Sequence, residues 1–98
     1  MYCNQTIICG KITKLGVLRY TPAGIAIIEF TVKHVSQKIE AGVARQIMCE
    51  VLAVALDQLA LIVAGFEINS TVKLAGFLNK RSHLNQQLVL HIDHIELI

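Results

Sequence analysis

The sequence carries very little excess charge of either sign. Nine Lys or Arg residues stand against seven Asp or Glu residues, which leaves a formal net charge of +2 over 98 residues. Proteins that bind duplex DNA are usually more basic than this. Any attraction for a nucleic acid must therefore come from where the cations lie, and not from the total charge.

The chain also lacks an apolar run long enough to cross a membrane as a helix. Its longest apolar-rich segment, residues 51–66, is interrupted by Asp57 and Gln58 and is shorter than the roughly 20 residues that a span needs. No charged stretch leads into an apolar core at the beginning of the chain, so we expect no secretory leader and a cytoplasmic protein without membrane contact. Because 54% of the residues are hydrophobic, we also expect self-association.

Cysteine is scarce, and its three positions form no CxxC pair. Cys3, Cys9 and Cys49 are an odd number of thiols in a chain without a leader, which indicates reduced cysteines. No base or metal-ligating residue accompanies any of them at a defined spacing. We therefore predict buried structural thiols.

Catalytic patterns are missing as well. The serines lie in turns without a glycine elbow, and no phosphate-cradling loop is present. In a C-terminal strand His91 and Asp93 would share one face, whereas His94 and Glu96 would point to the other, which splits a four-ligand metal site. The sequence predicts a protein that is not an enzyme and that has no metal site and no cofactor.

What is present is a series of strand-like segments. Apolar and polar residues alternate, or β-branched residues gather, over residues 6–15, 25–34, 45–54, 72–78 and 88–98. Turn residues lie at 20–24 and 40–42, and residues 56–65 fit a short helix or a loop. Five strands with few helices predict an all-β single domain over residues 1–98, built as a small closed barrel, because a sandwich usually has more strands.

Cations gather at two places along these segments. Lys11, Lys14 and Arg19 fall within nine residues, and Lys80 and Arg81 open the polar segment 79–87. Such a loop can follow a phosphate backbone, or it can be a solvated hairpin tip.

Four segments of the chain carry a resemblance to a known family. The strings YTPAGIAIIEFTVKH, EAGVARQIMCEV, VKLAGFL and VLHIDHIELI are similar to the PriB family (primosomal replication protein N) of bacterial single-stranded-DNA-binding proteins, from about residue 7 to residue 98. The resemblance implies a five-stranded Greek-key OB-fold barrel that forms a homodimer. It also implies a role in replication restart, in which the protein binds single-stranded DNA and bridges a restart helicase (PriA) and a helicase-loading partner (DnaT).

The resemblance also implies which residues contact DNA. Arg19 stands where the family has a cation in the loop between the first two strands, and Lys80 with Arg81 lies in the hairpin loop between the last two, which is basic in the family. Met48 stands where the third strand usually has a tryptophan. The predicted contacts to phosphates and bases are Lys14, Arg19, Tyr20, Arg45, Met48, Lys80 and Arg81.

Three positions depart from the family pattern. Besides Met48, Val43 replaces an aromatic residue and Val35 replaces a basic one. Stacking on an aromatic ring stabilises a bound base by roughly 1–3 kcal/mol, so the loss of two rings predicts binding weaker by about tenfold to a thousandfold or more. Tyr20 is a compensating base contact if it faces the groove, and otherwise a residue of the barrel rim. The alternative function is a protein-interaction adaptor of the primosome with weak or vestigial DNA binding.

Overall fold

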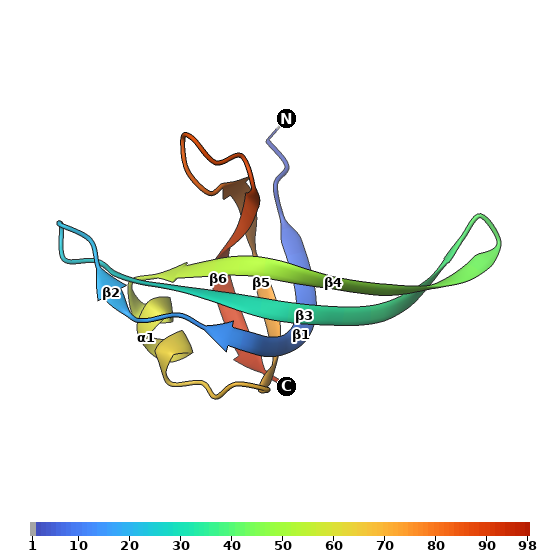
Figure 1. Ribbon diagram of the computed structural model, residues 1–98, viewed down its shortest axis with the longest axis horizontal. Helices are drawn as coiled ribbons and strands as arrows, with labels where there is room; N and C mark the ends of the chain where they lie inside the picture. Colours follow the sequence, from blue (N-terminus) through green and yellow to red (C-terminus); the bar gives the residue numbers. More distant parts are fainter. Residues whose placement is uncertain (1) are drawn as a thin grey trace.

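The computed structural model describes residues 2–98, and within them it consists of strands and one short helix (Figure 1). In chain order the elements are β1 Thr6–Leu15, β2 Arg19–Tyr20, β3 Ala26–Glu40, β4 Val43–Leu56, α1 Gln58–Ala64, β5 Thr71–Lys80 and β6 Leu88–Leu97.

Five of the strands close into a barrel. They follow the order β1-β5-β6-β4-β3, and a further pairing of β1 with β3 joins the two ends. The β4–β6 pair is parallel, whereas the other pairs are antiparallel. The two-residue strand β2 adds to the outer edge of β3. The predicted all-β OB-fold barrel is confirmed.

The core follows directly from the period-two pattern of the strands. Alternate residues of β3, among them Phe30 and Val32, are buried inside the barrel, and Leu74 of β5 and Leu90 of β6 meet them from the other side. Helix α1 packs against β3, β4 and β6 with Val63 fully buried. Of the two alternatives for residues 56–65, the helix is the one observed.

Strands β5 and β6 approach each other closely at Gly76. A Cβ atom at this position would overlap the carbonyl oxygen of His91, so only glycine fits. The register of the β5–β6 pair shifts between Ala75 and Gly76, which is the effect of a β-bulge. This close approach fixes where His91 lies on the outer surface of the barrel.

Strands β3 and β4 are much longer than the sequence predicts. Their paired residues continue from the barrel to Glu40 and Val43, and the hairpin projects from the barrel as an arm, residues 33–50 (at the right of Figure 1). Ala41 and Gly42 form its two-residue turn, both with positive φ, as type I′ hairpin turns require. The predicted strands ended at residue 34 and began at residue 45 because most arm residues are exposed on both sides, which leaves no one-sided apolar pattern to detect.

The prediction of buried thiols is wrong. Cys3, Cys9 and Cys49 are all exposed. Ile12 of β1 is buried, and the even-numbered residues before it, Thr6, Ile8 and Gly10, are half-buried on the same side, so Cys9 points outward. Cys49 lies on the arm, outside the barrel core.

Candidate nucleic-acid interface

The outer surface of β3 carries the polar half of its alternating pattern. Because Phe30 and Val32 point into the barrel, Glu29, Thr31 and Lys33 point out of it. In the β3–β4 pair Glu29 lies opposite Val54, so the two share this outer face.

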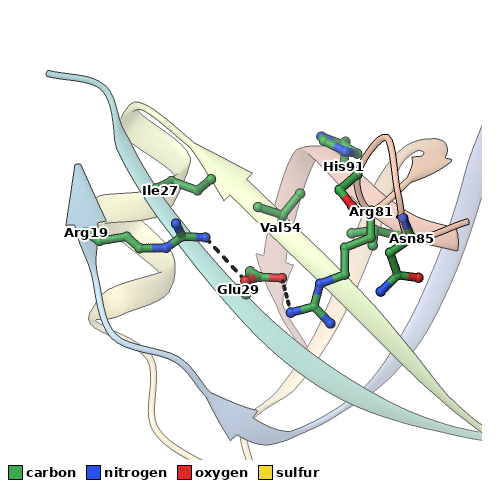
Figure 2. Close-up of a pocket in the computed structure, with 9 residues that line it drawn as sticks. Arg19, Ile27, Glu29, Val54, Arg81, Asn85 and His91 are labelled. Atoms are coloured by element: carbon green, nitrogen blue, oxygen red, sulfur yellow. Dashed lines mark hydrogen bonds and ion pairs between the residues drawn. The ribbon is translucent and has the colours of Figure 1, made fainter. Parts of the chain in front are cut away.

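Two arginines from distant parts of the chain meet at Glu29. Arg19 pairs in register with Ile27, which places it on the outer face, and its Nη2 lies 3.3 Å from Oε1 of Glu29. Arg81 begins the loop between β5 and β6, and its Nη2 lies 3.3 Å from Oε2 of the same carboxylate. Figure 2 shows Glu29 between the two guanidinium groups. The Glu29 side chain remains 28% exposed, so the three charges lie at the surface of the protein.

Two adjoining clefts surround this triad. The larger has a volume of about 340 Å³, and its lining includes Arg19, Glu29 and Arg81 together with Val54, Asn85 and His91. The smaller, about 190 Å³, is lined by Lys14, Thr31 and Leu52 and again by Glu29 and Arg81. Because both clefts share Glu29 and Arg81, we treat them as one groove, the Glu29 groove.

The groove has the chemistry of a site for a polyanion. Lys14, Arg19 and Arg81 contribute three cations and Glu29 one carboxylate, so the positive charges exceed the negative by two. Guanidinium groups present planar forks of N–H donors that fit phosphate oxygens. Exchange of the Glu29 carboxylate for a phosphate would preserve the hydrogen bonds of both arginines.

Two of the predicted residues lie at the barrel but outside this groove. Tyr20 pairs with Ala26, whose side chain points inward, so Tyr20 lies on the side of β2 opposite Arg19 and is 62% exposed. Lys80 pairs with Leu88 at the end of β5 and lines neither cleft. Tyr20 therefore lies outside the Glu29 groove, and its contact with a base stays a prediction.

The remaining two predicted residues lie on the arm, on opposite sides of it. Met48 pairs with Val35, which lies on the same outer face of β3 as Glu29 because both are odd-numbered residues of the strand. The Met48 side chain is 59% exposed. Arg45 pairs with Lys38 on the other side and forms an ion pair with Glu40 at 3.1 Å. Val35 follows Glu29 by six residues, so Met48 lies about 20 Å along the strand from the triad.

Sequence reasoning did not select Glu29 or His91 for this site, and it indicated Asn85 only as part of the polar segment 79–87. The alternating pattern of β3 does put Glu29 on the polar face, but nothing in it points to two arginine partners. In the sequence, His91 stands out only as a possible metal ligand. Over residues 2–98 no group of three or more His, Cys, Asp or Glu side chains could hold a metal ion. In the same part of the chain no helix is long and apolar enough to cross a membrane.

Comparison with known proteins gives consistent matches over almost the whole chain. The sequence model of a family described as "another single-strand binding protein family" matches residues 4–94. The replication restart protein PriB of Nitrosomonas europaea is 42% identical over 95 residues, which cover 97% of this chain and 88% of that protein. PriB of Photorhabdus laumondii is 34% identical over 102 residues, covering 100% of this chain and 96% of that protein. These relatives are named as replication restart proteins and not as enzymes.

Solved structures agree with the fold. A structure of PriB from Ralstonia solanacearum superposes with a TM-score of 0.89 at 28% identity, covering 98% of each chain. A deletion mutant of the single-stranded DNA binding protein from Thermus aquaticus superposes with a TM-score of 0.80 over 98% of this chain and 50% of that one. Its identity of 19% supports the shared fold alone. From the family match and the identity to its relatives, the chain belongs to the single-strand-binding protein family and, within it, to the replication restart protein PriB group.

Proposed function

We propose that this protein binds single-stranded DNA in the Glu29 groove and acts, without catalysis, in replication restart. The observation that carries the proposal is the meeting of Arg19 and Arg81 at one partly exposed carboxylate, that of Glu29, with Lys14 on the adjoining cleft. The names of the relatives and the description of the family support the same function.

The binding is electrostatic in origin. A cation that contacts a phosphate releases a condensed counterion, so the logarithm of the binding constant falls linearly with the logarithm of the salt concentration. For single strands the slope is about −0.7 for each phosphate neutralised, which gives about −2 for the three groove cations. Glu29 compensates part of this charge in the free protein, so we expect modest affinity.

The test is a fluorescence anisotropy titration of a labelled oligothymidylate at several salt concentrations. We expect measurable binding at low salt and a slope near −2, with weaker binding to a duplex of the same length. Binding that is undetectable at low salt, or that does not change with salt, would contradict the proposal.

We propose further that the protein forms a homodimer. In replication restart this homodimer bridges a restart helicase (PriA) and a helicase-loading partner (DnaT). Exposed aliphatic side chains support an association of this kind, among them Ile7, Leu61, Ile62 and Leu97. Sedimentation equilibrium that returned only the mass of one chain, 10.8 kDa, would contradict the homodimer.

A second candidate function is an adaptor that mainly contacts proteins. The arm favours it, because it exposes Val35, Ile39, Val43 and Met48 and carries no Phe, Tyr or Trp. A pull-down with the restart helicase separates the two functions. If an Arg19→Ala/Arg81→Ala variant no longer binds the oligonucleotide but still binds and stimulates the helicase, the result would favour the adaptor.

A further inference from the structure

Two rings stack on each other on the outer surface of β5 and β6. The centroids of Phe77 and His91 lie 5.1 Å apart, and their planes differ by 10°. The two residues are directly opposite in the β5–β6 pair. Phe77 is nevertheless 42% exposed, although a phenylalanine of a barrel strand usually points into the core.

The ring pair is the end of a row that starts in the Glu29 groove. Glu29 of β3 lies opposite Val54 of β4, Val54 lies opposite His91 of β6, and His91 lies opposite Phe77 of β5. All four side chains point out of the barrel, since their chain neighbours Phe30, Ala53, Leu90 and Leu78 belong to the core or pack against it. With neighbouring strands about 4.8 Å apart, the row runs about 14 Å across the barrel.

His91 connects the row to the arginines. It lines the larger cleft together with Arg19, Arg81 and Asn85. The close-up of this cleft places Val54 between Glu29 and His91 (Figure 2). The cleft therefore runs from two guanidinium groups past Val54, which is 6% exposed, to His91, and the stacked ring of Phe77 lies next to His91 on β5.

This spatial order, with guanidinium groups at one end and rings at the other, matches the composition of a single-stranded nucleic acid. Phosphates need cations, whereas bases need flat apolar surfaces on which to stack, and proteins that bind single strands combine the two. The His91 ring covers one side of Phe77 and fixes its orientation, so little conformational freedom is left to lose on binding. The side-chain amide of Asn85, in the same cleft, can hydrogen-bond to the edge of a base.

We propose that Phe77 and His91 form a stacking site for a nucleobase, and that a single strand crosses β3, β4, β6 and β5 with its phosphates at the arginines. Both residues belong to the barrel strands β5 and β6 and not to the arm. This inference rests on the proposed function, because it assigns the base contact of the same bound strand.

The first test uses a Phe77→Leu variant and two labelled probes of equal length, an oligothymidylate and an oligomer of abasic deoxyribose phosphates. Leucine keeps an apolar side chain of similar size but removes the ring. We expect the affinity for the oligothymidylate to fall by about fivefold to a hundredfold, the loss of one base stack, while the affinity for the abasic oligomer stays the same. Ile68→Ala is the control, because it truncates an apolar side chain between α1 and β5 that is 47% exposed and lines neither cleft, and it should bind both probes as the unchanged protein does.

A second variant tests the same site by spectroscopy. The chain has no tryptophan, so Phe77→Trp introduces a single fluorescent reporter. We expect its emission to be quenched by the oligothymidylate and not by the abasic oligomer, and its affinity to equal or exceed that of the unchanged protein.

The outcomes separate this inference from the proposed function. If the unchanged protein binds the oligothymidylate, but Phe77→Leu binds it equally well and Phe77→Trp is not quenched, the stacking site is wrong and the groove function stands. If the unchanged protein binds neither probe, the proposed function itself fails. Equal losses for both probes in Phe77→Leu would mean that the ring supports the fold of the groove, which would also overturn the stacking site.

Discussion

Replacing Arg19 and Arg81 together by alanine is expected to lower the affinity for an oligothymidylate by a factor on the order of a hundred at low salt. A hydrogen bond to a charged group contributes about 1.5–3 kcal/mol, and two guanidinium groups are removed. Both side chains are partly exposed, at 61% and 44%, so solvent and salt reduce the effect below the sum. Glu29 is then left without its two partners, and its charge repels the incoming phosphates.

Removing the negative charge at the centre of the triad should raise the affinity for the oligothymidylate. Glu29→Gln removes the carboxylate that competes with phosphate for both arginines, so the affinity should rise severalfold and the salt slope should steepen. Glu96→Gln is the matched control, because it removes one carboxylate, paired with Lys73 at 4.0 Å, away from the groove. Equal gains from Glu29→Gln and Glu96→Gln would show that total charge, and not the triad, governs binding.

These charge changes should leave the fold nearly intact. Exposed ion pairs contribute only about 0–1 kcal/mol to stability, and the described side chains of the chain include no buried charged residue. Circular dichroism and thermal melts of the Arg19→Ala/Arg81→Ala variant should therefore resemble those of the unchanged protein. A lost binding signal then reports on the groove itself.

Phe30→Ala is expected to cost about 3–5 kcal/mol of unfolding free energy, a large part of the roughly 5–15 kcal/mol that a domain has. The ring is 1% exposed and is among the largest fully buried side chains of the barrel. Its removal loses the transfer free energy of the ring and leaves a cavity that the barrel can only partly fill. Urea unfolding followed by circular dichroism measures the difference.

Val35→Ala provides the control on the same strand. Val35 lies on the arm, five residues beyond Phe30, and is 52% exposed. Its truncation should change the unfolding free energy by no more than about 0.5 kcal/mol. Comparable losses from the two variants would mean that the arm, and not the barrel interior, holds the fold together.

The barrel could be predicted from the sequence because its strands have a buried face. Phe30 and Val32 alternate with polar residues, and this pattern fixes both the strand and the side that faces inward. The arm could not be predicted in the same way. Beyond His34 exposed positions lie on both sides of the ribbon, and the long pairing with residues 43–49 depends on the continued register of two strands.

The groove was only partly predictable for a related reason. Lys14, Arg19 and Arg81 stand out as cations, but their distances depend on the closure of β1 against β3 and on the path of the loop after β5. Tyr20 shows the limit most clearly. A turn at residues 20–24 predicts no side for the ring, whereas the pairing of Arg19 and Tyr20 with β3 puts the two on opposite sides.

The most direct measurement is a map of backbone amide chemical shifts during titration of the ¹⁵N-labelled protein with an oligothymidylate. We predict that the changes gather along the row from the arginines to the ring pair, at Arg19, Glu29, Val54, Arg81, His91 and Phe77. Changes confined to the other side of the molecule, at Tyr20 and Arg45, with the row unaffected, would contradict a strand bound in the Glu29 groove.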